Sequence, residues 1–285
     1  MQKLCILITI IAILIISGCN KTDDYITIKG ERYSTSLTEL DLYAKGLQNN
    51  DIFPLKYMTN LEYLRLSCNE ITDITPLSDL TTLTDLRLDS NRITDITPLF
   101  NLTNLTALEL GVNRISDITS LANLNNLTSL SVVHNKISDI TPLFNLTNLT
   151  ALELGGSSIS DLPQLAVFTH LTTLSVSHSE ISDLMPLSKL INLSELILIG
   201  NEITDLIPLA ELNNLTLLFL SGNKISDLTP LANLTNLTRL WLHINEIDDL
   251  LPLSGLMNLT ELLLHDNPII DWSPVAHVPN VVGRP

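Results

Sequence analysis

The sequence predicts an α/β solenoid, in which short strands form a parallel sheet on a concave face and short 3₁₀ or helical segments line the convex face. Two observations support this fold class. A 22-residue pattern recurs along most of the 285 residues, and 45% of the residues are hydrophobic although only 4% are aromatic. A single core rarely grows this large, because cores split into domains of about 100–200 residues. Repeat folds escape this limit, since each unit packs only on its neighbours.

The chain begins with a segment typical of export signals. Lys3 precedes thirteen residues, from Leu4 to Ile16, that are all apolar except Thr9. About 20 apolar residues are needed to cross a bilayer. This shorter run therefore fits the hydrophobic region of a secretory signal peptide.

The four residues Ile16-Ser17-Gly18-Cys19 resemble the bacterial lipobox. The resemblance implies cleavage before Cys19 and a diacylglycerol on its thiol, and more than one acyl chain gives stable anchoring. We therefore expect a lipoprotein signal peptide over 1–18 and a lipid anchor and tether over 19–25. The protein would be exported and held by this lipid at the cell surface or envelope. Ordinary secretion, with Cys19 incidental, is the alternative.

Both ends of a solenoid expose an apolar face that needs a cover. Residues 26–36 alternate like a strand, with Ile26 and Ile28 on one face, and are expected to form an N-terminal cap strand. At the other end, Trp272 opens a segment rich in Pro and Val. We expect a C-terminal cap followed by an irregular tail over 272–285.

The repeats occupy residues 37–271 and number about eleven, of which the first, from Leu37 to about Asn60, carries two extra residues. Leucines five and three residues before a recurring Asn should point inward from a short strand, while the residue between them points outward. The Asn amide should satisfy backbone groups that the following turn leaves unpaired. Ser157 and Ser179 replace it twice, so we expect the ladder of amides to be weakest there. The asparagines are Asn69, Asn91, Asn113, Asn135, Asn201, Asn223, Asn245 and Asn267.

The pattern L-x-x-L-x-L-x-x-N-x-I resembles the leucine-rich repeat, and the 22-residue length with its D-I-x-P-L continuation is similar to the internalin type of bacterial surfaces. The resemblance covers roughly residues 37–275 and implies a leucine-rich-repeat horseshoe that binds other proteins. Internalins often carry a helical cap, an immunoglobulin-like domain and a wall-sorting signal. None of these is visible in the sequence, so host-cell invasion is not carried over.

An Asp stands four residues after each Asn position, and Pro follows it three residues later in eight of ten units. We expect each Asp to accept backbone N–H bonds where the convex segment begins, and Pro to fit the first turn of that segment. A stack of carboxylates that binds a cation is the alternative. The ten are Asp73, Asp95, Asp117, Asp139, Asp161, Asp183, Asp205, Asp227, Asp249 and Asp271.

The central outward position of the strands is polar or charged in the first seven units and apolar in the last four. A contiguous exposed apolar patch marks an interaction site, and Trp and Arg are enriched at binding hot spots. We expect a protein ligand on this concave patch. The alternatives are that the residues shield one another or form a homodimer contact. The expected ligand-binding residues are Ile197, Ile199, Leu217, Phe219, Arg239, Trp241 and Leu263.

Two further groups stand on the same face. Arg65 and Arg87, near Tyr63, are expected to form a secondary polar contact surface or a solvated charged face. His243 and His265 should lie about 5 Å apart on adjacent strands. They could hold zinc, but an incidental pair is favoured, and protonation of both should weaken binding below about pH 6.

Charge and motifs restrict the function. The chain has 15 basic and 31 acidic residues, which argues against nucleic acid, because phosphate binding needs clustered Lys and Arg. No phosphate loop, nucleophile elbow or zinc-protease motif is found. We therefore expect a lipid-anchored protein-binding module without cofactor or enzymatic activity. The alternatives are a structural or self-associating envelope lipoprotein and a polysaccharide-binding protein.

Overall fold

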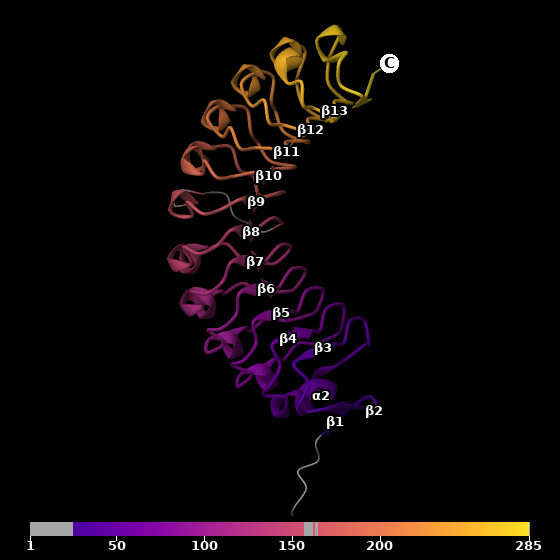
Figure 1. Ribbon diagram of the computed structural model, residues 1–285, viewed down its shortest axis with the longest axis vertical. Coiled ribbons are helices and arrows are strands. Elements are labelled where there is room, and N and C mark those ends of the chain that lie inside the picture. The colour runs from indigo at the N-terminus through magenta and orange to yellow at the C-terminus, as the bar shows by residue number, and fades with distance from the viewer. Residues whose placement is uncertain (1–24, 157–161, 163–164, 285) are drawn as a thin grey trace, which may run out of the picture.

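The computed structural model describes residues 25–156, 162 and 165–284, which form one curved solenoid (Figure 1). Twelve strands hydrogen bond in chain order into a single parallel sheet. The sheet lines the concave side, and the 3₁₀ segments line the convex side. The predicted fold class is therefore confirmed. Within the described ranges, no helix has the length and apolar character needed to cross a bilayer.

The sheet keeps a constant register. Each strand residue pairs with the residue 22 positions further on in all regular units, as Leu196 does with Leu218 and Leu218 with Leu240. Eleven strands match the eleven expected units. They are β3 Glu39–Asp41, β4 Tyr63–Arg65, β5 Asp85–Arg87, β6 Ala107–Glu109, β7 Ser129–Ser131, β8 Ala151–Glu153, β9 Thr173–Ser175, β10 Glu195–Ile197, β11 Leu217–Phe219, β12 Arg239–Trp241 and β13 Glu261–Leu263.

A twelfth strand, β14 (Asn280–Val282), lies in the segment that was expected to be an irregular tail. It pairs with β13 in parallel, and Val281 packs against the core. The tail prediction is wrong here, because Val281 takes the inward position of a further strand and covers the apolar end of the core.

The convex side consists of short 3₁₀ segments, most of which carry Pro in the first two positions. Proline fits there because its fixed φ suits the first turn and its missing N–H would be unpaired anyway. The first unit also holds one α-helical turn where the two extra residues occur. The segments are α2 Asn49–Ile52, η1 Phe53–Tyr57, η2 Thr75–Leu77, η3 Thr97–Leu99, η4 Thr119–Asn123, η5 Thr141–Asn145, η6 Leu165–Val167, η7 Met185–Lys189, η8 Ile207–Leu209, η9 Thr229–Leu231, η10 Leu251–Gly255 and η11 Ser273–Val275.

The N-terminal end is a hairpin rather than the single strand expected over 26–36. Strand β1 (Tyr25–Ile28) pairs antiparallel with β2 (Glu31–Ser34). The chain reverses at Lys29 and Gly30, which both have positive φ, at 46° and 84°. Positive φ at both central residues matches the right-handed twist of a two-residue hairpin. Ile26 and Ile28 are buried and join the core of the repeats.

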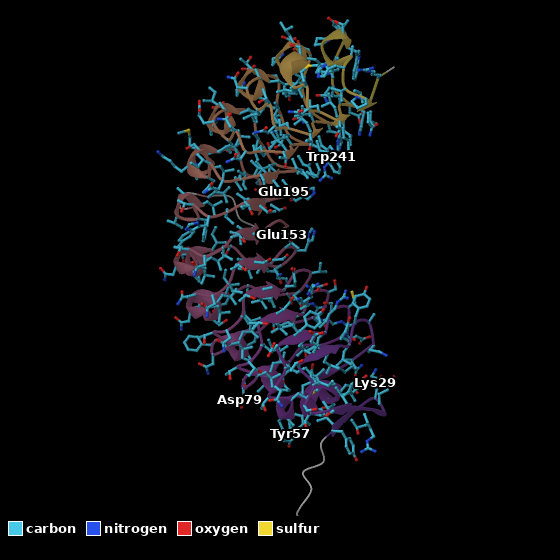
Figure 2. All side chains as sticks on the ribbon, viewed as in Figure 1. Lys29, Tyr57, Asp79, Glu153, Glu195 and Trp241 are labelled. Carbon is cyan, nitrogen blue, oxygen red and sulfur yellow. The ribbon has the colours of Figure 1, made fainter. Side chains whose placement is uncertain are left out.

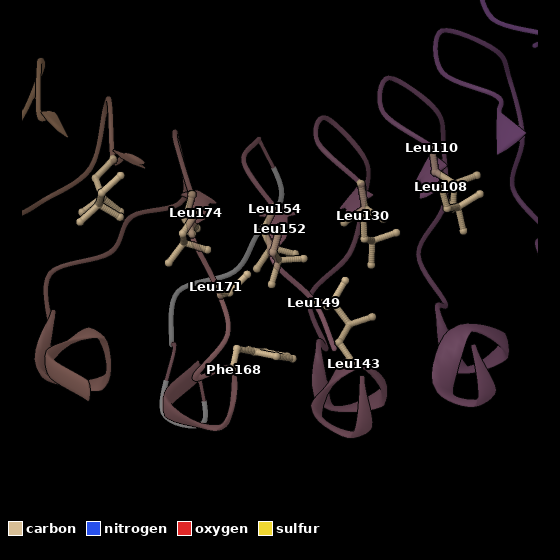
Figure 3. Close-up of a cluster of buried hydrophobic side chains, with 14 of the residues drawn as sticks. Leu108, Leu110, Leu130, Leu143, Leu149, Leu152, Leu154, Phe168, Leu171 and Leu174 are labelled. Carbon is tan, nitrogen blue, oxygen red and sulfur yellow. The ribbon is translucent and has the colours of Figure 1, made fainter. Parts of the chain in front are cut away.

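The core is a continuous stack of leucines between the sheet and the convex segments. Figure 3 shows side chains such as Leu130 and Leu152 pointing from the strands into this space, where Phe168 also lies. These three side chains are at most 1% exposed. Complete burial of one such side chain contributes about 1.5–3 kcal/mol, so every added unit stabilises the units beside it.

The Asn ladder links consecutive units. The amide nitrogen of Asn223 donates to the carbonyl of Leu220 in its own unit (2.8 Å) and of Leu198 in the preceding unit (3.0 Å). Its oxygen accepts the backbone N–H of Ile203 at 3.1 Å. By contrast, the Ser179 hydroxyl donates to Ser177 in its own turn, and no bond from it to a neighbouring unit is seen in the described part of the chain. The expected weak turn at Ser179 is confirmed, while Ser157 lies outside the described residues.

The residue before each ladder position has left-handed backbone conformation. Gly200 and Gly222 occupy this position in two units, with φ of 67° and 69°. Val112 and Ile244 adopt the same conformation, at 55° and 57°, and are exposed. Positive φ is unusual for β-branched residues, so the turn geometry is imposed by the ladder and not by local preference.

We predict that replacing a ladder amide destabilises the solenoid strongly. Asn223→Ala should lower the free energy of unfolding by roughly 3 kcal/mol, because it leaves the buried N–H of Ile203 without its acceptor and removes a buried amide that bridges two units. The matched control is Asn236→Ala, since the exposed amide of Asn236 donates a single hydrogen bond within the described residues, to Asn213. Its effect should stay below about 1 kcal/mol. Urea unfolding followed by circular dichroism measures both, and equal losses would contradict a structural role for the ladder.

Candidate interaction surface

The constant register brings the apolar outward residues of four strands into one row. Ile197 on β10 pairs with Phe219 on β11, Phe219 pairs with Trp241 on β12, and Trp241 pairs with Leu263 on β13. We call these four residues the apolar column. The strands project them from the concave side of the sheet, where Figure 2 shows Trp241.

The two aromatic rings of the apolar column lie face to face. The ring centroids of Phe219 and Trp241 are 3.7 Å apart and the planes differ by 8°. As a result Phe219 is only 8% exposed, and neighbouring Leu217 only 6%. The expectation that both are exposed is therefore wrong, because parallel strands set large side chains close enough to cover each other. Ile197, Trp241 and Leu263 remain half-buried.

Polar groups border the apolar column. The indole N–H of Trp241 donates to Glu261 at 2.6 Å, which fixes the orientation of the ring. The guanidinium of exposed Arg239 lies 6.0 Å from the ring centroid of Phe219. Half-buried Ile199 lies beyond the end of β10, in a flanking row that continues with Ser221. Of the seven expected binding residues, Phe219 and Leu263 are direct neighbours of Trp241 on the adjacent strands, while Ile197 and Ile199 lie two strands away. Leu217 and Phe219 lie beneath the surface.

The two histidines form a stacked pair beside this patch. The rings of His243 and His265 are 4.5 Å apart at an angle of 18°, close to the expected spacing. His243 Nδ1 hydrogen bonds with the Ser221 hydroxyl at 2.8 Å, and His265 Nδ1 with Asp266 at 2.7 Å. Burial, and then the neighbouring His265, lower the pKa of His243. Both effects favour the neutral ring of His243, so its protonation requires more acidic solution than that of a free histidine.

The centre of the concave face carries carboxylates that the sequence did not single out. Glu109 on β6 and Glu153 on β8 stand in the same outward row as the apolar column, and Glu195 stands on β10. We call these three residues the acidic strip, and Figure 2 shows Glu153 and Glu195 on the concave side. Among the described residues, none of the three forms an ion pair. The signal in the sequence was the lack of any basic residue in that row between Arg87 and the apolar column.

Burial and repulsion act together on Glu109. Burial, followed by the nearby carboxylates of Glu153 and Asp89, raises the pKa of Glu109 to about 7, although Arg87 opposes the shift. Glu153 is better satisfied, since it accepts a hydrogen bond from Ser131 at 2.9 Å. The face therefore holds a carboxylate whose negative charge is destabilised at neutral pH.

The residues of the expected secondary surface lie next to one another, but aspartates on the same face neutralise the charges of its arginines. Arg87 donates to both carboxylate oxygens of Asp85, at 3.2 and 3.1 Å, and its guanidinium carbon lies 5.5 Å from the ring centroid of Tyr63. Arg65 lies 3.6 Å from Asp41 and over an aromatic ring of the preceding unit. These arginines offer little unpaired positive charge, and a contact role for them stays a prediction.

The Asp row on the convex side bonds to the backbone. Asp73, for example, accepts the N–H of Thr75 at 2.8 Å, and eight further members do the same with the residue two positions later. Hydrogen bonds from Thr75 lower the pKa of Asp73. Asp161 lies outside the described residues. The part of the chain that the structure describes holds no group of three or more His, Cys, Asp or Glu residues placed for a metal ion.

Comparison with protein-family models identifies the repeat. The model described as leucine-rich repeats (2 copies) matches residues 81–123, 125–167 and 213–255. Two further leucine-rich-repeat models match residues 35–93 and 169–184. A search of curated proteins gives no significant match.

Solved structures with the same repeat include internalins of Listeria monocytogenes. Internalin InlF has 33% sequence identity and a TM-score of 0.70, covering 88% of this chain and 89% of its own. Internalin C2 has 40% identity and a TM-score of 0.59, covering 66% of this chain and 83% of its own. The functional domain of InlJ has 29% identity and a TM-score of 0.73, covering 89% of this chain and 56% of its own.

We predict that Glu109 makes stability depend on pH. The folded carboxyl binds a proton up to about pH 7, whereas the unfolded one releases it near its ordinary value of 4.5. Ionised Glu109 therefore destabilises the fold at pH 8, and the penalty disappears as pH falls below 4.5. Glu109→Gln should stabilise by about 1 kcal/mol at pH 8, a figure reduced because solvent screens this half-exposed group.

Urea unfolding of parent and variant at pH 8 and pH 4 measures this difference. The gain of Glu109→Gln should vanish at pH 4. Exposed Glu211 on the convex side supplies the control, because Glu211→Gln removes the same charge away from the strip. A gain at pH 8 that is equal for both variants would show a general charge effect and not one specific to the concave face.

Proposed function

The chain belongs to the leucine-rich-repeat family, and we propose that it is a surface-displayed module that binds a protein on the concave face of its solenoid. The observation that carries this proposal is the apolar column across β10–β13. Ile197, Trp241 and Leu263 keep part of their apolar surface open to solvent, and clustered exposed apolar surface marks interaction sites. Trp241, held by Glu261 and flanked by Arg239, has the character of a binding hot spot.

The geometry of the rings argues against polysaccharide as the ligand. Sugars stack on the open faces of aromatic side chains. Here one face of Trp241 is covered by Phe219 at 3.7 Å, and its other neighbour in the sheet is Leu263. The aromatic pair therefore suits contact with apolar side chains of a protein better than stacking on a sugar ring.

We further propose that a lipid on Cys19 holds the protein at a membrane. Residues 1–24 lie outside the described residues, so support comes from the sequence. A thirteen-residue apolar run ends directly before Ser17-Gly18-Cys19. A diacyl cysteine supplies the two chains that stable anchoring requires, and the short segment up to Tyr25 would place the solenoid close to that membrane.

We predict that binding depends on Trp241. Residues 20–285, which contain all of the described fold, would be used to capture partners from host-cell and bacterial-envelope extracts. Trp241→Ser should abolish capture while leaving the circular dichroism spectrum native, because the ring is half-buried on the surface. Ile207→Ser is the matched control, since Ile207 is 68% exposed on the convex side. Capture of the same partner by Trp241→Ser would contradict a binding role for this patch. Capture of no protein other than this chain itself would favour self-association.

We predict that Cys19→Ala releases the protein from membranes. The parent, expressed in full in a bacterium, should enter the detergent phase of a Triton X-114 extraction and incorporate labelled fatty acid. The variant lacks the thiol that accepts the lipid, so it should incorporate none and move to the aqueous phase. Cys68→Ala is the control, because Cys68 lies at a repeat turn. Unchanged labelling of Cys19→Ala would contradict the lipid anchor.

A further inference from the structure

We propose that the partner contributes a segment in which basic side chains are followed by a large apolar one, with the basic part over the acidic strip and the apolar part over the apolar column. The inference rests on the proposed function, because it names the chemistry of the partner of the same concave face. It concerns the acidic strip (Glu109, Glu153 and Glu195) and the apolar column (Ile197, Phe219, Trp241 and Leu263).

No member of the acidic strip forms an ion pair within the described residues. The arginines on its N-terminal side are already engaged, Arg87 with Asp85 at 3.1 Å and Arg65 with Asp41 at 3.6 Å. Arg239, on its C-terminal side, stands two strands beyond Glu195. Arg87 stands beside Glu109 on the neighbouring strand and offsets the rise of its pKa only in part. Glu153 and Glu195 have no ion-pairing partner among the described residues.

One member of the strip is costly to keep ionised. Burial and the proximity of Glu153 raise the pKa of Glu109 to about 7. A partner cation placed between these carboxylates would offset their repulsion, and it would act in a partly dehydrated setting where a charge pair is stronger than in bulk water. A neutral or acidic partner would leave the repulsion or add to it.

The two surfaces adjoin on one strand, because β10 carries both Glu195 and Ile197. With strands about 4.8 Å apart, the acidic strip from β6 to β10 spans roughly 19 Å and the apolar column from β10 to β13 roughly 14 Å. An extended segment rises about 3.3 Å per residue. Some ten residues of a partner thus suffice to cover both surfaces when the segment runs across the strands.

Charge also argues against a second copy of the chain on this face. Two copies related by a twofold axis would bring like patches together. With a formal net charge of −16 and the strip at the centre of the face, such a contact would oppose carboxylates to carboxylates. A basic partner has complementary charge, which steers association and selects against wrong partners.

A displayed library of random 12-residue peptides tests the inference. Residues 20–285 serve as bait, and binders retained by Trp241→Ser are removed by counter-selection. The expected peptides carry Lys or Arg in one half and an aromatic or large aliphatic residue in the other. Calorimetry then gives their dissociation constants for the parent and for Glu109→Gln/Glu153→Gln, which should bind at least about tenfold more weakly.

A matched double variant controls for net charge. Asp79→Asn/Glu211→Gln removes two charges from exposed convex positions (Asp79 is labelled in Figure 2) and should keep parental affinity. Trp241-dependent peptides of neutral or acidic composition would overturn the basic-segment inference and leave the concave binding face intact. Equal weakening by both double variants would also overturn it. Failure to obtain any Trp241-dependent peptide would reject a linear segment as partner, while capture of a folded protein still tests the proposed function separately.

Discussion

The rest of the structure depends on the hydrogen bonds that each ladder asparagine makes to backbone groups of its own unit and of the unit before. The amide of Asn223 reaches Leu198 and Leu220 with its nitrogen and Ile203 with its oxygen. The ladder persists even where the first unit has two extra residues, because these lie in the α2 turn and Asn69 still bonds to Leu42 and Leu47 of that unit. The ladder therefore fixes how consecutive units align and which residues stand side by side on the sheet.

Because the register is constant, the chemistry of the concave face is organised in rows of residues 22 apart. Similar side chains become neighbours within a row, and they alter one another's packing and pKa values. Two aromatic rings stack, and two imidazoles stack. Burial, and then Glu153 two strands away in the same row, raise the pKa of Glu109. A substitution on this face acts through its neighbours 22 residues away more than through adjacent residues of the sequence, which point to the opposite side of the sheet.

The sequence predicts the repeat architecture well, because the register is constant. Eleven repetitions of one pattern identify the inward leucines, the ladder and the outward rows, and the structure places Ile197, Phe219, Trp241 and Leu263 in one row as expected. Non-repeated segments were predicted less well. The hairpin turn at Lys29-Gly30 and the strand around Val281 occur once, so no periodicity marks them. The burial of Phe219 and Leu217 was missed because exposure depends on the size of neighbours and on the curvature of the sheet.

The same logic explains why the acidic strip escaped notice. In the sequence, each of its glutamates resembles an ordinary solvated residue of an acidic protein. The strip is distinctive because few basic residues lie near it. Arg65 and Arg87 stand in the same row, but the structure pairs each with an aspartate. Arg87 therefore offsets the charge of Glu109 on the next strand only in part, and the row holds no further basic residue before the apolar column. Since the apolar column begins on the strand where the acidic strip ends, the concave face changes from acidic to apolar along the solenoid axis. A partner segment that matches both surfaces must therefore bind in one orientation, and the order of the repeats determines that orientation.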